Sequence, residues 1–116
     1  MSQRILRGEI WLANLNPTQG SEQSGIRPVI IFQNDLVSRY SSTTLSIPLT
    51  TNQSRASLPI CLFIPQGEGG LAQNSVALCF QMRVLDKTRL IKKLGILSDS
   101  RIVELEETVL LTLGYE

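Results

Sequence analysis

The chain has 116 residues, 42% of them hydrophobic, and its eleven Lys and Arg against ten Asp and Glu leave a net charge of +1. This length supports one hydrophobic core, so we predict a single domain over residues 1–116. The near-zero net charge excludes a protein whose whole surface is strongly positive. A polyanionic ligand would therefore have to bind at a local positively charged patch.

Five short apolar runs fill the first three quarters of the chain, and each has the length and composition of a β-strand. They span residues 9–17, 27–35, 43–51, 58–65 and 74–86. Turn-forming Gly, Pro, Asn and Ser residues separate them. Strands at this spacing predict a small barrel or strongly coiled sheet, because such a sheet hides its edges. Pro48 has no N–H, which predicts an edge or a bulge in the third strand.

The last quarter of the chain is the most helical part. The stretch DKTRLIKK (86–93) predicts a helical turn capped by its first residue, and LGILS (94–98) predicts a further short strand. A C-terminal α-helix follows Ser98 or Asp99 as N-cap and ends at Gly114. Its apolar positions at three- and four-residue spacing are Ile102, Leu105, Val109 and Leu113. The predicted fold class is therefore mainly β, a β-rich α+β protein with a C-terminal α-helix.

The rare residue types narrow the chemistry. The chain has no histidine, and Cys61 and Cys79 form no CxxC pair, which excludes zinc sites of the usual spacing and His-dependent catalysis. Both cysteines lie in apolar runs, so we predict buried thiols in a reducing compartment. The charged start MSQRILRGEI does not fit a signal peptide, and no apolar run has membrane-spanning length. We therefore expect a cytoplasmic protein without a membrane segment.

Three further features each have an ordinary structural interpretation and a functional alternative. GEGGLA (67–72) matches a phosphate-binding glycine pattern, but a strand follows it instead of a helix, so we predict a flexible hairpin loop. Trp11 in the first strand is predicted to pack in the core or an interface. The basic cluster Lys87, Arg89, Lys92 and Lys93 is either a solvated face or a rim that follows phosphates, and both interpretations stay open.

Arg27 stands where a polar loop enters an apolar strand. Pro28 stiffens this entry, so the guanidinium is presented from a fixed position at a loop–strand junction, where functional side chains are common. The alternative is a surface arginine in an ion pair with Glu22 or Asp35. On this stretch alone, the ion pair is the better interpretation.

Several stretches together resemble the MazF/PemK family of toxin endoribonucleases, the toxic halves of type II toxin–antitoxin pairs. They are residues 7–35, IPLT at 47–50, SVALCFQMRVLDKTRL at 75–90, and LGILSD with the tail LTLGYE. The resemblance implies an SH3-like, CcdB/PemK-like barrel of about five to seven strands. It also implies a homodimer, metal-independent cleavage of single-stranded RNA without a cofactor, and an antitoxin whose extended C-terminal segment lies over the RNA groove.

The family's functional arginine in the GxRP segment and the threonine that closes its third strand correspond to Arg27 and Thr50. Attack of a 2′-OH on the adjacent phosphate gives a 2′,3′-cyclic phosphate and a 5′-OH, and it requires cationic stabilisation of the phosphorane. Arg27 suits this task because its planar fork grips phosphate oxygens and stays charged, which also makes it a poor general base. Thr50 can donate to a phosphate oxygen, and Glu22 could assist it if the loop folds over the site.

Unpaired RNA bases are recognised through their edges and faces. Candidate RNA-binding residues in the segments that the resemblance places near the cleft are Ser21, Glu22, Gln23, Asn34, Gln81 and Arg83. Phe80 stands where family members often carry an acidic residue, so a carboxylate contribution from that position is in doubt. Two alternatives follow: a binding toxin that does not cleave, as in gyrase poisons, or a catalytically degenerate homologue.

Overall fold

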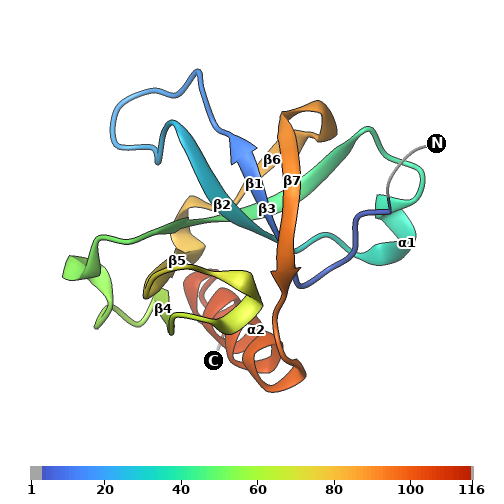
Figure 1. The fold of residues 1–116 in the computed structure, drawn as a ribbon. Helices are drawn as coiled ribbons and strands as arrows, with labels where there is room; N and C mark the ends of the chain where they lie inside the picture. The colour runs from blue at the N-terminus through green and yellow to red at the C-terminus, as the bar shows by residue number, and fades with distance from the viewer. Residues whose placement is uncertain (1–3, 116) are drawn as a thin grey trace.

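The computed structural model describes residues 4–115, which form seven β-strands and a C-terminal helix packed at one end of the sheet (Figure 1). The strands are β1 (Glu9–Asn14), β2 (Ile26–Ile31), β3 (Thr43–Thr50), β4 (Cys61–Ile64), β5 (Ser75–Leu78), β6 (Arg83–Asp86) and β7 (Leu90–Ile96). The α-helices are α1 (Asp35–Ser38) and α2 (Asp99–Thr112), and short 3₁₀ turns are η1 (Gln53–Arg55), η2 (Glu68–Gly70), η3 (Cys79–Gln81) and η4 (Lys87–Arg89). The mainly β fold class with a C-terminal helix is confirmed.

The sheet is antiparallel, with strand order β4-β5-β3-β2-β1-β7, and β6 also pairs with β3. The prediction of one strand over residues 74–86 is wrong. Ser46 of β3 pairs with Arg83, but Leu49, only three residues on, pairs with Ala77, six residues back. The register against β3 thus shifts by three residues, and the three residues of η3 take up the shift. Coiling of β3 therefore divides its partner into β5 and β6.

Pro48 does not lie at a sheet edge, so the first of the two predicted alternatives is wrong, whereas the irregular pairing of β3 at this point agrees with the second. Pro48 pairs with Val29 of β2, and β3 is an interior strand. On the other side of β3, however, neither Ile47 nor Pro48 has a partner, because pairing changes there from β6 to β5. A residue without an N–H is tolerated at such a gap, since no ladder hydrogen bond is lost there.

The helical turn predicted over residues 86–93 is only partly present. Asp86 caps η4, with its Oδ1 accepting a hydrogen bond from Thr88 N at 2.9 Å. From Leu90 onward the chain is strand β7, which pairs with β1 from Ala13↔Leu90 to Glu9↔Ile96. The edge of β1 offers backbone partners that outweigh the helix propensity of the lysines, because local propensity is a weak preference.

Two apolar clusters lie on opposite faces of the coiled sheet. Alternation along β1 places Ile10 in the cluster that α2 covers with Leu105 and Val109, and places Trp11 in the other cluster with Val29. Trp11 is 3% exposed, which confirms its predicted packing role. Full burial of an aliphatic side chain such as Ile10 or Leu105 stabilises the fold by about 1.5–3 kcal/mol.

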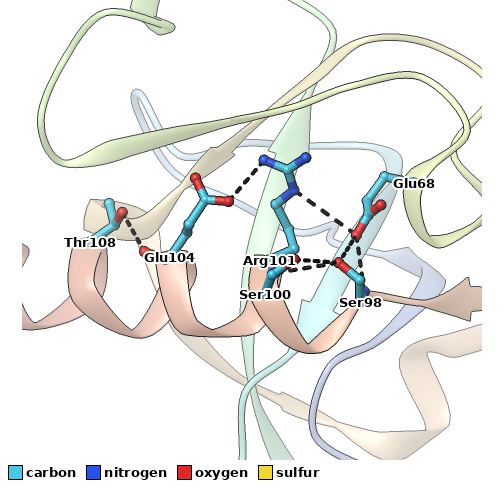
Figure 2. A network of polar contacts seen from close by, with 6 residues as sticks. All are labelled: Glu68, Ser98, Ser100, Arg101, Glu104 and Thr108. Atoms are coloured by element: carbon cyan, nitrogen blue, oxygen red, sulfur yellow. Dashed lines mark hydrogen bonds and ion pairs between the residues drawn. The ribbon is translucent and has the colours of Figure 1, made fainter.

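The start of α2 is fixed to the β4–β5 loop (Figure 2). Ser98 is the N-cap, accepting a hydrogen bond from Arg101 N at 3.3 Å. Glu68 Oε1 in turn accepts from Ser98 N at 2.9 Å and from Ser98 Oγ at 2.8 Å. A Cβ on Gly95 would lie 2.5 Å from the Gly69 carbonyl oxygen. Antiparallel pairing of β4 with β5 makes the glycine-rich segment the predicted hairpin loop, but its contacts with β7 and Ser98 hold it in place, contrary to the predicted flexibility. Within residues 4–115 no helix has the length and apolar character needed to cross a membrane.

Candidate functional site

Arg27 lies at the start of β2, where the β1–β2 loop enters the sheet. Its side chain is exposed, and its Nε donates a hydrogen bond to the Ser24 carbonyl at 3.1 Å. The predicted ion pair is absent from the described residues: Glu22 Oε1 accepts from Gln19 N at 2.6 Å, and Asp35 Oδ1 accepts from Arg7 N at 2.8 Å. The donors on both Nη atoms of Arg27 therefore remain available for a ligand.

Thr50 closes β3 directly beside Arg27. The β2–β3 pairing ends at Val29↔Pro48, two residues before Thr50 on β3 and two residues after Arg27 on β2. Arg27 and Thr50 line a small pocket of about 30 Å³, together with Pro28, Leu49, Thr51 and Ser75. Thr50 Oγ1 accepts a hydrogen bond from Asn52 N at 3.2 Å, so its own proton is left for another acceptor. The two predicted catalytic side chains thus meet at this pocket.

Two further pockets adjoin this pair. One, of about 110 Å³, shares Thr50 and is otherwise lined by Ser21, Gln23, Asn52, Arg55, Leu78 and Gln81. The other, of about 230 Å³, shares Gln81 and is lined by Glu22, Phe80, Met82 and Arg83. We call the residues of these three pockets the Arg27–Thr50 surface. It contains seven of the eight predicted site residues.

Asn34 is the predicted residue that the structure does not bring to this surface. It follows the opposite end of β2, where its Oδ1 accepts from Leu36 N at 2.8 Å and caps α1. Arg27 is the second residue of β2 and Asn34 lies three residues beyond its last, so most of the strand separates them. A larger pocket of about 290 Å³ lies near this end, beside α1, and is lined by Arg4, Ile5, Leu6, Asp35, Ser38, Arg39 and Lys87.

Sequence reasoning missed Asn52 and Arg55, which follow Thr50 in the β3–β4 connection. The Arg55 guanidinium lies 5.3 Å from the centroid of the Phe80 ring, which is 36% exposed. Phe80 thus forms a cation–π contact that stabilises Arg55 on this surface, where an acidic residue at the same position would supply a carboxylate. The sequence signal that could have identified Arg55 is a cationic residue in the loop that follows the IPLT strand. Arg27, Arg55 and Arg83 each line one of the three adjoining pockets, so each pocket of the Arg27–Thr50 surface has one cationic side chain.

The basic cluster after Asp86 has mainly structural partners. Lys93 forms an ion pair with Glu9 at 2.8 Å. Arg89 Nη1 donates to the carbonyls of Asn14, at 3.2 Å, and Asn16, while Lys87 Nζ donates to the Ser38 carbonyl. These contacts favour a structural role over a rim that follows phosphates.

Both cysteines are buried and unpaired, as predicted. Burial raises the pKa of the Cys61 thiol, although the charge of Arg55 opposes this shift. Burial, with a smaller effect from Cys61, raises the pKa of Cys79 to about 12. Neither thiol is therefore poised as a nucleophile, since the thiolate is the reactive form.

The fold and this surface define a small β-barrel-like protein whose strand ends hold arginines, amides and hydroxyls around adjoining pockets, a class suited to phosphate-bearing ligands. The family of the PemK-like, MazF-like toxin of type II toxin–antitoxin systems matches residues 6–113, and the chain belongs to this family. The predicted family is thereby confirmed.

Relatives agree with this assignment. The chain is 42% identical over 110 residues to the endoribonuclease MazF of Staphylococcus epidermidis, covering 95% of this chain and 92% of the relative. A MazF crystal structure from Deinococcus radiodurans has a TM-score of 0.83 at 21% identity, covering 97% and 99% of the two chains. A mycobacterial endoribonuclease in complex with its cognate antitoxin has a TM-score of 0.80 at 20% identity, covering 97% of each. The solved structures share the fold, and the chain is a MazF endoribonuclease homologue.

Proposed function

We propose that this chain is a sequence-selective endoribonuclease toxin that cleaves single-stranded RNA without a metal ion. The observation that carries the proposal is that Arg27 and Thr50 line one pocket, which shares Thr50 with a second pocket that in turn shares Gln81 with a third. A phosphate in the first pocket meets a cation and a hydroxyl. The bases on either side of it meet amides, hydroxyls and further arginines.

Cleavage follows from attack of the 2′-OH on the adjacent phosphorus. The new P–O2′ bond forms as the P–O5′ bond breaks; the 2′-OH loses its proton to water and the leaving O5′ takes a proton from water, which gives a 2′,3′-cyclic phosphate and a 5′-OH. Arg27 stabilises the phosphorane through its two Nη groups, while its Nε bond to Ser24 fixes the direction of the fork. Thr50 donates a hydrogen bond from its hydroxyl to a phosphate oxygen, because Oγ1 already accepts from Asn52 N.

Glu22 has a different position from the one a general base for Thr50 would need. It lines the pocket of Phe80 and Arg83, and it does not line the Arg27–Thr50 pocket. Its carboxylate already accepts a hydrogen bond from Gln19 N within the β1–β2 loop. This geometry supports a role for Glu22 in RNA contacts at the edge of the surface.

We further propose that the toxin is a homodimer in the cytoplasm and that a cognate antitoxin covers the Arg27–Thr50 surface. The exposed apolar side chains of α2 support a protein partner for that helix, since Val103, Leu110 and Leu111 are each about half exposed. Light scattering should give a dimer mass for wild type and a monomer mass for Leu110→Asp. An unchanged mass in Leu110→Asp would remove α2 from the interface.

RNA cleavage tests the activity directly. Purified protein is mixed with a long single-stranded RNA in EDTA, and the 5′ ends are mapped. Wild type should give 5′-OH ends at a short sequence motif, and Arg27→Ala should cleave at least about 100-fold more slowly. Arg39→Ala is the matched control, because Arg39 is an exposed arginine beside α1.

The other outcomes separate the alternatives. Intact RNA with wild type, or equal cleavage by Arg27→Ala, would show that this mechanism is wrong. RNA binding without cleavage would identify a degenerate homologue, and inhibition of DNA supercoiling would identify a gyrase poison. Cleavage that EDTA abolishes would contradict metal independence.

A further inference from the structure

Gln81 uses both ends of its side-chain amide on the β1–β2 loop. Its Oε1 accepts a hydrogen bond from Gln23 N at 2.7 Å, and its Nε2 donates to the Ser21 carbonyl at 3.3 Å. The amide therefore binds the loop backbone much as a neighbouring strand would, with one donor and one acceptor. These contacts cross from η3 to a loop about sixty residues earlier in the chain.

The backbone of Gln81 is itself held in place by the core. It ends η3, whose first residue Cys79 is buried and accepts a hydrogen bond from Met82 N at 3.2 Å. The loop segment that Gln81 holds is exposed at Ser21 and Ser24. Among the described residues, residues 18–24 form hydrogen bonds with β1, β2 and each other, and with one further element. Those further bonds are the two made by Gln81. The anchored glutamine thus restrains an otherwise exposed loop.

The same loop holds Arg27. The Ser24 carbonyl, one residue beyond Gln23, accepts the Nε–H of Arg27 at 3.1 Å. Movement of residues 21–24 would carry this acceptor away and release the guanidinium from its orientation. Because misplacement of a catalytic group by about 1 Å can cost about 100-fold in rate, the loop position matters for the reaction.

We propose that Gln81 is a positioning residue: it holds residues 21–24 and, through Ser24, sets the Arg27 guanidinium for the scissile phosphate. Gln81 acts on the loop backbone and does not read an RNA base. The inference rests on the proposed function for its effect on the rate, but the contact between Gln81 and the loop stands independently of RNA.

The first measurement therefore uses the protein without RNA. Amide hydrogen exchange and ¹⁵N-resolved NMR spectra follow the Gln23 N–H and the Arg27 Nε–H in wild type, Gln81→Ala and Gln81→Met. The Met variant keeps the side-chain length and removes only the amide. Both variants should exchange the Gln23 amide about tenfold faster and lose protection of the Arg27 Nε–H. Gln66→Ala, an exposed glutamine in the β4–β5 loop, should match wild type in exchange and in cleavage.

The second measurement is cleavage of a random-sequence RNA pool. Gln81→Ala and Gln81→Met should lower kcat about tenfold while the order of preferred cleavage sites stays as in wild type. Unchanged protection of Gln23 and Arg27 would overturn the positioning role. A changed preference at one base position would overturn the claim that Gln81 reads no base. If wild type cleaves no RNA, the proposed function fails, and the exchange data alone decide whether Gln81 holds the loop and Arg27.

Discussion

Removal of the buried carboxylate Glu9 should strongly destabilise the fold. Glu9 is 2% exposed, and its Oε1 accepts hydrogen bonds from Leu6 N at 2.9 Å and from Trp11 Nε1 at 3.0 Å. Its Oε2 pairs with Lys93 Nζ at 2.8 Å. In Glu9→Ala the indole N–H, on a residue that is 3% exposed, loses its acceptor in the core. The loss per unsatisfied buried donor is about 1–3 kcal/mol.

The two orphaned donors together lower the free energy of unfolding of Glu9→Ala by about 2–4 kcal/mol, because Leu6 is half-buried and falls at the low end of the range. The Lys93 ion pair adds at most about 1 kcal/mol, since the Lys93 side chain is 41% exposed and rehydrates. Glu9→Gln keeps an oxygen for both donors and should lose only about 1 kcal/mol.

Urea unfolding at one fixed protein concentration measures these differences, with Glu107→Gln on the exposed face of α2 as the matched control. Burial alone raises the pKa of Glu9, but hydrogen bonds from Lys93, Leu6 N and Trp11 lower it below its ordinary value overall. The carboxylate therefore stabilises the fold above its unfolded-state pKa, and this stability is lost as the pH falls through the folded-state pKa. The gap between wild type and Glu9→Gln should shrink in acid. A Glu9→Ala loss below about 0.5 kcal/mol, or a gap that is constant with pH, would refute the reasoning.

Three further outcomes follow from the core and the loop packing. Leu105→Ala, at a fully buried position under the sheet, should lower the free energy of unfolding by about 2–5 kcal/mol in urea, and a smaller loss would show that the core collapses around the cavity. Gly95→Ala places a Cβ 2.5 Å from the Gly69 carbonyl and should cost about 1–3 kcal/mol, unless the β4–β5 loop moves away, which hydrogen exchange of that loop would reveal. Burial raises the pKa of Cys79 from 9.0 to about 12, so its stabilising contribution is complete below pH 9 and is lost as the pH rises towards 12. The free energy of unfolding of Cys79→Ala should therefore fall less than that of wild type over this pH range, and an equal fall would contradict the burial argument.

Local patterns predicted the elements that local chemistry controls. Ser98 as N-cap, the apolar spacing to Val109 and Gly114 with its positive φ of 93° identified α2 and both its ends. The β-composition of the other runs located most strands, and burial of Cys61 and Cys79 followed from their apolar neighbours. The family itself was evident from motifs that cover most of the chain.

The errors arise where pairing over long sequence separations overrides local preference. The three-residue register shift against β3 divides the run 74–86, and the free edge of β1 draws Leu90 and the residues after it into β7. Asn34 has suitable chemistry for RNA, but it caps α1 at the far end of β2. A propensity scale contains no information about which strand edge is vacant.

The sequence by itself determined the kinds of groups available: an arginine stiffened by Pro28, a threonine closing a strand, and amides in polar loops, with no histidine to share the work. Only the tertiary structure decided which of them meet. Pairing of β2 with β3 brings the ends of the two strands together, so that Arg27 and Thr50 line one pocket. The hydrogen bonds of Gln81 with Ser21 and Gln23 hold the β1–β2 loop beside Arg27 and Thr50. Composition fixes the chemistry of each side chain, but their distances depend on strand pairing, which joins residues far apart in the chain.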